Sequence, residues 1–193
     1  MKLIFATQNL HKRDEVQSLL GGEIIVTSLA DLHFSEDLAE THATLEENAL
    51  EKAMFISNRF GMDCFAEDTG LEVESLQGAP GVYSARYAGE GKQAEDNIRL
   101  LLHNLGGNAN RRARFRTVIC LYMQQRPYYF EGIVNGSIAN SPSGSYGFGY
   151  DPVFIPEGSD RTFAVMTQEE KNAVSHRRKA IDKMIRFLKD RDQ

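Results

Sequence analysis

Residues 113–139 read ARFRTVICLYMQQRPYYFEGIVNGSIA, and this stretch does most to decide the fold class. Two runs rich in β-branched and aromatic residues, 113–123 and 128–139, are separated by the short polar segment 124–127. This pattern predicts a long β-hairpin. Because the strands of a hairpin are antiparallel, a sheet that contains this one is antiparallel or mixed.

On either side of the hairpin, short apolar runs alternate with segments of helical periodicity. A capping box at 44–47, Thr-Leu-Glu-Glu, marks the start of one helix, and a second at 167–170 precedes the last helix. Gly21-Gly22 would stop the first helix. The other predicted strands are residues 3–6, 24–26, 64–66, 71–76 and 153–155. The predicted helices are residues 12–20, 45–60 and 94–105 and the C-terminal segment.

This order of elements predicts an α/β fold with a mixed β-sheet flanked by helices. A length of 193 residues suits one domain, or one domain built as two lobes. No segment has the composition of a linker, so residues 1–193 are expected to form a single domain.

The overall composition excludes some classes of protein. There are 27 acidic and 22 basic residues, a formal net charge of −5, and a general DNA or RNA binder would carry a basic surplus. The apolar run at 3–6 is too short for a signal peptide or a membrane span. Cys64 and Cys120 lie in apolar runs and are expected to be buried thiols in a reducing compartment. We therefore expect a cytoplasmic protein with no nucleic-acid or membrane partner.

Two segments at the ends of predicted strands could hold phosphate and metal. Residues 7–12, TQNLHK, join a strand to a helix N-terminus, where free N–H groups and the helix dipole favour anions. Glu67 and Asp68 follow a buried strand, and such hard oxygen ligands suit Mg²⁺. Asp68 could also accept a proton from water. The plainer explanations are a helix cap with Lys12 in solvent, and an acidic turn.

Two later segments could hold a flat base and further charges. In GFGYDP, residues 147–152, the glycines allow close approach of a ligand, Phe148 could stack on it, and Asp151 could accept from a ring N–H. Lys171, His176 and Arg177 offer donors near a helix boundary. The plainer explanations are a structural turn and a solvated helix face.

Taken together, five blocks in this order resemble the inosine triphosphate pyrophosphatase family, also called Ham1-like. The blocks are ATQNLHK (6–12), THATLEENALEKA (41–53), EDTGLEVESLQGAPGVYSARYAG (67–89), GFGYDPVFIP (147–156) and EEKNAVSHRRKA (169–180).

The resemblance implies an activity: Mg²⁺-dependent hydrolysis of deaminated purine triphosphates (ITP, dITP and XTP) to the monophosphate and pyrophosphate. It also implies a homodimer and a two-lobed fold of the Maf/Ham1-like type, with the site in the cleft between the lobes. The departures from the family pattern are His42 and Gln77, each at a position where Gly is usual.

The resemblance also assigns residues. Asp68 matches the general base and a metal ligand, and Glu40 a second metal-associated carboxylate. Lys52 is expected to face phosphate and Thr69 to contact substrate. The triphosphate would be held by Thr7, Gln8, Asn9, Leu10, His11 and Lys12. The base would be surrounded by Phe148, Gly149, Tyr150 and Asp151, and the nucleotide site completed by Lys171, His176 and Arg177.

Selection among purines follows from hydrogen bonding. A donor from His176 or Arg177 near O6 of the base would be left unpaired against adenine, at a cost of roughly 1–3 kcal/mol. Three alternatives stay open: a pyrophosphatase for modified pyrimidine or methylated nucleotides, a nucleotide sensor without turnover, and a nucleic-acid-binding protein, which the net charge disfavours.

Overall fold

The structure is a computed structural model that describes residues 1–20 and 24–191. The chain folds into two compact units. Unit 1 comprises Met1–Asp68, Thr117–Gly132 and Arg177–Gln193, and unit 2 comprises Thr69–Arg116 and Ile133–His176. The boundaries fall inside strands and at the start of the last helix, which agrees with a sequence that shows no linker.

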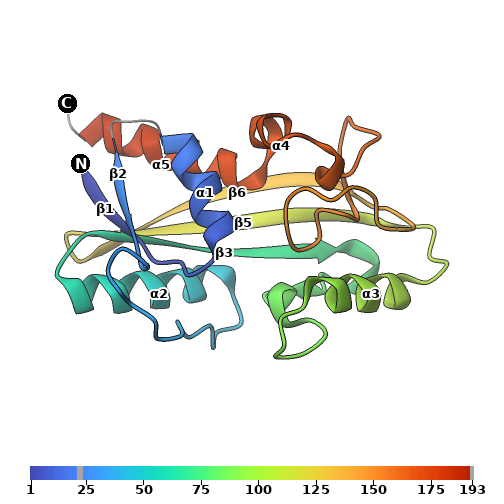
Figure 1. The fold of residues 1–193 in the computed structure, drawn as a ribbon, viewed down its shortest axis with the longest axis horizontal. Coiled ribbons are helices and arrows are strands. Elements are labelled where there is room, and N and C mark those ends of the chain that lie inside the picture. The colour runs from blue at the N-terminus through green and yellow to red at the C-terminus, as the bar shows by residue number, and fades with distance from the viewer. Residues whose placement is uncertain (21–23, 192–193) are drawn as a thin grey trace. The chain divides into compact units, whose positions relative to one another are not determined.

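Strands and helices alternate in the first part of the chain, whereas consecutive strands and then two consecutive helices make up the last part (Figure 1). The strands are β1 (Lys2–Phe5), β2 (Ile25–Ser28), β3 (Cys64–Val73), β4 (Pro80–Gly81), β5 (Arg112–Met123), β6 (Arg126–Ile138) and β7 (Phe154–Pro156). The helices are α1 (Leu10–Leu20), α2 (Leu45–Phe60), α3 (Ala94–Leu105), α4 (Gln168–Val174) and α5 (His176–Arg191), with 3₁₀ turns η1 (Glu74–Leu76), η2 (Ser84–Arg86) and η3 (Phe163–Val165).

The predicted mixed sheet is confirmed. Among the described residues the strand order is β2-β1-β3-β5-β6-β7, with β4 on β3. β1 runs parallel to both β2 and β3, whereas β4 pairs antiparallel with β3 and β7 with β6. β5 and β6 are neighbours joined at Gln124 and Gln125, whose φ values of 52° and 59° give the left-handed turn that suits a two-residue hairpin loop.

In unit 1 both faces of the sheet are buried, because successive side chains of a strand point to opposite faces. Leu3, Phe5 and Phe65 belong to one cluster with residues of α1 and α5. Ile4 and Cys64 belong to a second cluster with residues of α2. Figure 1 shows α2 on one side of these strands and α1 and α5 on the other. Strands covered on both faces read as continuous apolar runs, as 3–6 and 64–66 do.

In unit 2 the strands are apolar on one face only. Leu71, Val73 and Phe115 are buried in a cluster with Leu101 and other residues of α3. The alternate residues of β3 and β5, among them Glu72, lie on the other face and are polar. This period of two is the pattern expected of a half-buried sheet.

The helix caps follow the predicted chemistry. The Thr44 side chain accepts the N–H of Glu47 at the start of α2, and Gly61 ends that helix with φ 64°. Thr167 and Glu170 form the full reciprocal capping box of α4. In the box of α2, by contrast, the Glu47 carboxylate accepts from the Thr44 hydroxyl and not from the Thr44 N–H. The predicted stop at Gly21-Gly22 lies outside the described residues.

The structure departs from the expected elements in three places. The EDTG segment is not a turn between strands, because β3 continues through it and ends at Val73. The half-buried strand predicted for 71–76 then gives way to η1, whose C-cap Gln77 has φ 55°. This left-handed conformation is easy for the Gly of the family pattern and strained for Gln. The last helical segment is broken at Ser175, whose extended backbone separates α4 from α5.

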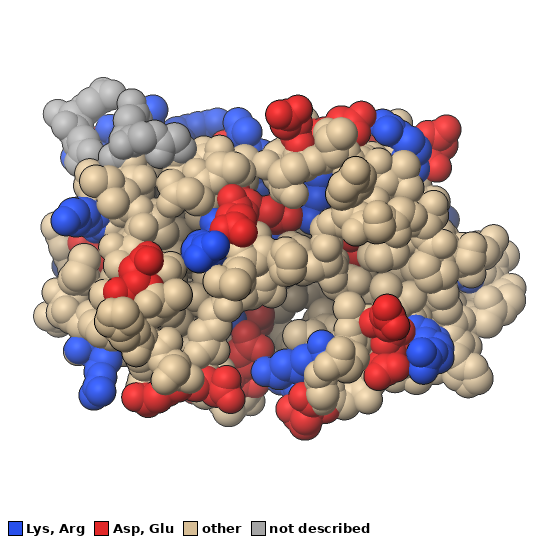
Figure 2. All heavy atoms as spheres, viewed as in Figure 1, with Lys and Arg blue, Asp and Glu red and all other residues tan. Residues whose placement is uncertain are grey.

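Charged side chains of both signs share the face of the molecule that Figure 2 draws. On the face drawn in Figure 2, acidic and basic side chains of the described residues are interspersed rather than gathered by sign. None of the helices in residues 1–20 and 24–191 has the length and apolar character needed to cross a bilayer.

Candidate functional site

The residues singled out from the sequence fall into two groups, one in each unit. Unit 1 contains residues 7–12 together with Glu40, Lys52, Asp68 and Arg177, and unit 2 contains Thr69, residues 148–151, Lys171 and His176. In unit 1 the structure brings Glu40, Lys52 and Asp68 into contact, and Lys12 and Arg177 meet on Glu67. In unit 2 it brings Phe148, Asp151 and Lys171 together.

The first contact set in unit 1 centres on a buried lysine. The Lys52 Nζ lies 2.6 Å from Glu40 Oε1 and 3.6 Å from Asp68 Oδ1. Lys52 and Asp68 are each 5% exposed. Asp68 is positioned by β3 and Lys52 by α2, while Glu40 comes from the loop before that helix. The Glu40 carboxylate is therefore bound to a buried ammonium, although it belongs to a loop.

The electrostatics of this set follow from burial and opposite charge. Burial raises the pKa of the Asp68 carboxyl, and the nearby Glu40 carboxylate adds to the rise, while Lys52 opposes it. Burial alone would lower the pKa of Lys52, but the Asp68 and Glu40 carboxylates outweigh it, so the pKa is raised and the ammonium stays charged. A buried carboxylate with a raised pKa is suited to accept a proton.

The second contact set in unit 1 is a buried ion cluster. Arg177 is 1% exposed, and its Nε and Nη2 donate to the two oxygens of Glu67 at 2.7 and 2.8 Å. Its Nη1 donates to Glu15. The Lys12 Nζ lies 3.1 Å from Glu67 Oε1. Neither Lys12 nor Arg177 therefore lies on a solvated helix face. The Arg177 guanidinium binds two carboxylates of unit 1, those of Glu15 and Glu67.

The start of α1 combines a cap with exposed side chains. The Lys12 N–H is accepted by Asn9 Oδ1 at 3.2 Å, and the Asn9 N–H by Thr7 Oγ1 at 3.2 Å. Gln8 Nε2 donates to the Glu36 carbonyl at 2.7 Å. Leu10 is 55% exposed, and His11 is also exposed. The segment therefore caps its helix with Asn9 and still presents a surface at the positive end of the helix dipole.

The donor set fits a divalent cation that arrives with phosphate. Across residues 1–20 and 24–191 no group of three or more His, Cys, Asp and Glu side chains is arranged to hold a metal. Mg²⁺ usually takes one or two carboxylates together with substrate phosphates, which is what Asp68 and Glu40 could supply. In the two contact sets, three cations face four carboxylates, which leaves a negative charge in excess: Lys12, Lys52 and Arg177 against Glu15, Glu40, Glu67 and Asp68.

In unit 2 a buried ion pair holds an aromatic loop. The Lys171 Nζ donates to Asp151 Oδ2 at 2.7 Å, with side-chain exposures of 3% and 4%. The same oxygen accepts the Phe148 N–H at 2.8 Å. The Lys171 Nζ also lies 4.8 Å from the centroid of the Phe148 ring, within the range of a cation–π contact. Lys171 is thus not on a solvated helix face.

The neighbours of this pair in unit 2 are also fixed by contacts. The Tyr150 hydroxyl donates to the Ser84 carbonyl at 2.9 Å, and burial raises the pKa of Tyr150. The His176 ring packs 4.8 Å from that of Phe115. Gly149 has φ 61°, a left-handed backbone. Thr69 is half-buried on β3.

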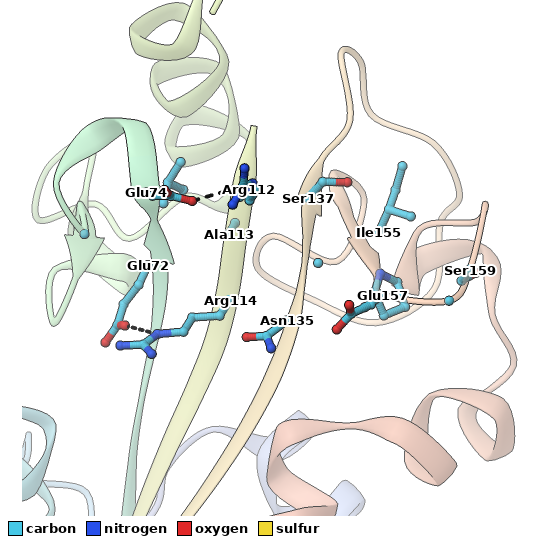
Figure 3. A pocket seen from close by; sticks show the side chains of 15 residues that line it. Glu72, Glu74, Arg112, Ala113, Arg114, Asn135, Ser137, Ile155, Glu157 and Ser159 are labelled. Atoms are coloured by element: carbon cyan, nitrogen blue, oxygen red, sulfur yellow. Dashed lines mark hydrogen bonds and ion pairs between the residues drawn. The ribbon is translucent and has the colours of Figure 1, made fainter. Parts of the chain in front are cut away.

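A hollow elsewhere in unit 2 contains none of the sequence-predicted residues. It measures about 670 Å³ and lies on the polar face of β3, β5, β6 and β7 (Figure 3). Four of its charged side chains are paired: Glu72 with Arg114 at 2.6 Å, and Glu74 with Arg112 at 3.8 Å. The contact sets around Asp68 and Asp151, rather than this hollow, hold the buried charges.

Sequence reasoning missed two residues of unit 1. Asn48 is wholly buried, and its Nδ2 donates to Asp68 Oδ2 at 3.0 Å. Glu15 is the second carboxylate on Arg177. Helical spacing offered a signal for both, since Asn48 stands four residues before Lys52 and Glu15 three after Lys12, and such pairs share a helix face.

Comparisons with known proteins point to one family. The model of the Ham1 family matches residues 3–187. The dITP/XTP pyrophosphatase of Flavobacterium johnsoniae is 50% identical over 97% of this chain and 98% of its own. That of Bacillus subtilis is 42% identical over 96% of each chain.

Two solved structures agree with this assignment. The Ham1 protein of Staphylococcus aureus superposes with a TM-score of 0.89 at 38% identity, covering 99% of this chain and 100% of its own. A HAM1 protein from Coxiella burnetii gives a TM-score of 0.90 at 35% identity, covering 98% and 99%. With matches over nearly its whole length in sequence and in fold, the chain belongs to the Ham1 family.

Proposed function

We propose that this protein hydrolyses the deaminated purine nucleotides ITP, dITP and XTP to the monophosphate and pyrophosphate, with Mg²⁺ as cofactor. The observation that carries the proposal is the buried set of Asp68, Glu40 and Lys52 in a chain of this family. The relatives that are 42–50% identical bear the name dITP/XTP pyrophosphatase. The reaction would remove deaminated purines from the nucleotide pool.

Asp68 is the proposed general base. Its carboxylate would accept a proton from, or orient, the water that attacks the α-phosphorus. Lys52 and Lys12 would stabilise negative charge that grows on the pyrophosphate leaving group, because preorganised charges act at full strength in a buried site. Mg²⁺ held by Asp68 and Glu40 would supply further neutralisation of phosphate charge.

The contact set of unit 2 is the proposed site for the base. The Phe148 ring offers a flat apolar face for a purine. Asp151 and Lys171 hold the backbone and the ring of Phe148, so that the stacking surface is formed before the nucleotide binds. His176 is the proposed donor toward O6, since all three guanidinium nitrogens of Arg177 are engaged with Glu67 and Glu15.

The assembly and the location are part of the same proposal. We expect a homodimer in the cytoplasm, as the family resemblance implies. Light scattering on a size-exclusion column at micromolar concentration should give twice the chain mass of 21.7 kDa. A mass of one chain would remove the dimer from the proposal and leave the proposed chemistry untouched.

The products tell which phosphorus is attacked. Purified protein with Mg²⁺ should release pyrophosphate and IMP or XMP from ITP and XTP, and leave ATP, GTP and dUTP nearly untouched. Both pyrophosphate and orthophosphate are read in parallel. Orthophosphate as the direct product would move the attack away from the α-phosphorus, and binding without any product would favour the sensor.

Gly147 supplies a sharper test of the base site. It has φ 77°, and a Cβ added there would collide with the Asp151 carboxylate. We expect Gly147→Ala to cost about 1–2 kcal/mol for the left-handed backbone alone and, through the collision, to raise the KM for ITP at least about tenfold, since it displaces the Phe148 loop.

A matched control is Gly158→Ala in the same unit. Gly158 has φ 83° with no atom within 4 Å of an added Cβ, so it carries the backbone strain without a collision. It should lose only the roughly 1–2 kcal/mol of the backbone strain in urea denaturation and keep its KM. Equal KM values for the two variants would mean that the Phe148 loop does not bind the base.

A further inference from the structure

Asn48 occupies a position that neither helix capping nor core packing explains. It lies in the first turns of α2 and is 0% exposed. An amide wholly removed from water is costly unless its donors and acceptor are all paired.

Its amide joins two separate parts of unit 1. Oδ1 accepts the N–H of His42 at 2.9 Å, and Nδ2 donates to the His42 carbonyl at 3.4 Å. Nδ2 also donates to Asp68 Oδ2 at 3.0 Å. One side chain thus holds the backbone of the loop and the carboxylate on β3.

These contacts leave the Asp68 carboxylate with little freedom. Asn48 takes Oδ2, while the Lys52 ammonium lies near Oδ1. Glu40 stands two residues before His42 and reaches the same ammonium. Without the Asn48 amide, Asp68 Oδ2 loses this donor and the His42 backbone loses its partner, so of these contacts only those to Lys52 still orient the carboxylate and the Glu40 loop.

We propose that Asn48 is a positioning residue for the hydrolysis: it orients the carboxylate of Asp68 and fastens the Glu40 loop to it. This inference rests on the proposed function and extends it to a residue that touches no substrate. An amide suits the role because it donates to a carboxylate and accepts from a backbone N–H at once, whereas an ionised aspartate cannot donate and an alanine can do neither.

The variant Asn48→Ala tests the role against a matched control. Asn97 is also a buried helical asparagine, 4% exposed, that bridges its helix to a loop, accepting from Ala88 N–H at 2.7 Å and donating to the Ala85 carbonyl at 3.0 Å. It belongs to unit 2, and none of these contacts is with a carboxylate. Asn97→Ala therefore measures what the loss of a buried bridging amide does to folding alone.

In Mg²⁺ and saturating ITP, Asn48→Ala should lower kcat about 100-fold, the scale expected when reacting groups are misplaced by about 1 Å. Its KM for ITP should stay within about threefold, because the proposed nucleotide contacts are elsewhere. Asn97→Ala should lose comparable thermal stability and keep kcat. Equal kcat values for the two variants, after correction for the folded fraction, would overturn the proposal.

A second measurement does not depend on activity. In ¹⁵N-labelled protein without metal, the side-chain NH₂ signals of Asn48 are identified by their loss in Asn48→Ala. Replacing Asp68 by Asn should shift those signals, and the Asn97 signals should stay in place. Unmoved Asn48 signals would refute the contact itself. If wild-type protein hydrolyses no nucleotide while the Asn48 signals do shift, the proposed function fails and the positioning contact stands.

Discussion

The Asp68→Asn variant is expected to bind ITP and to turn it over about 10²–10⁴-fold more slowly than the wild-type protein, the range set by loss of a general base. An amide is nearly the size of a carboxylate, and its oxygen can still accept from Asn48 Nδ2, so the buried site should keep its packing. What is lost is the ability to take a proton and the charge that pairs with Lys52. Steady-state rates and calorimetric binding of ITP separate the two effects.

The control for this variant is Asp63→Asn, also in unit 1. Asp63 accepts the N–H of Gln124 at the hairpin turn, 3.0 Å away, and has no part in the proposed chemistry. It should leave kcat unchanged. A kcat for Asp68→Asn within a few-fold of the wild-type value would show that another group accepts the proton.

The second large effect is expected on stability. Replacing Arg177 by Met should lower the free energy of unfolding at pH 7 by about 3–5 kcal/mol, because it leaves buried carboxylates without their cation. Arg177 is 1% exposed and contacts both Glu67 and Glu15. Urea titration in a metal-free buffer measures the change.

The variant should also reverse the pH dependence of stability. Burial alone would raise the pKa of Glu67, but Arg177 and Lys12 hold it well below its usual value. A carboxyl with a lowered pKa stabilises the folded state above its unfolded pKa of about 4.3 and loses this contribution as the pH falls below that value. Without Arg177 only Lys12 opposes the effect of burial, so we expect the pKa of Glu67 to rise above its unfolded value. The folded state then takes up protons more readily and gains stability from pH 7 toward pH 5.

Arg178→Met is the matched control for this effect. Arg178 is the next residue on α5, and it pairs with Asp182 one turn later, both side chains being 43% exposed. A surface pair of this kind contributes about 0.3–0.5 kcal/mol. The free energy of unfolding of Arg178→Met should therefore depend on pH as that of the wild-type protein does. Parallel pH curves for wild-type protein and Arg177→Met would mean that Glu67 does not depend on this guanidinium.

Local patterns in the sequence predicted most of the fold. The hairpin, the caps of α2 and α4, and the strands of unit 1 follow from apolar runs and from Thr at helix starts. The hairpin turn was harder to place, because Gln124 and Gln125 adopt left-handed φ values without the Asn or Gly that usually mark them. The break at Ser175 lacks a Gly or Pro, and its only signals were a Ser, which is common at helix starts, and the helix boundary expected near residues 171–177.

The candidate site could be predicted only as a set of residues. Arg177 pairs with Glu67, which is 110 positions away in the sequence, and Lys171 pairs with Asp151, which is 20 positions away. The residues next to these cations in the sequence therefore did not distinguish them from solvated ones. Burial decides their chemistry, and burial is set by packing over the whole of each unit. Asn48 could have been found locally, since it precedes Lys52 by one helical turn.

Both compact units are assembled from separated stretches of chain, with boundaries inside β3, β5 and β6. A single cut at the hairpin turn would give pieces 1–124 and 125–193, each of which carries parts of unit 1 and of unit 2. Neither piece could complete either hydrophobic core by itself. The chain is therefore suited to fragment complementation, in which two separately produced polypeptides become a working protein only when they meet.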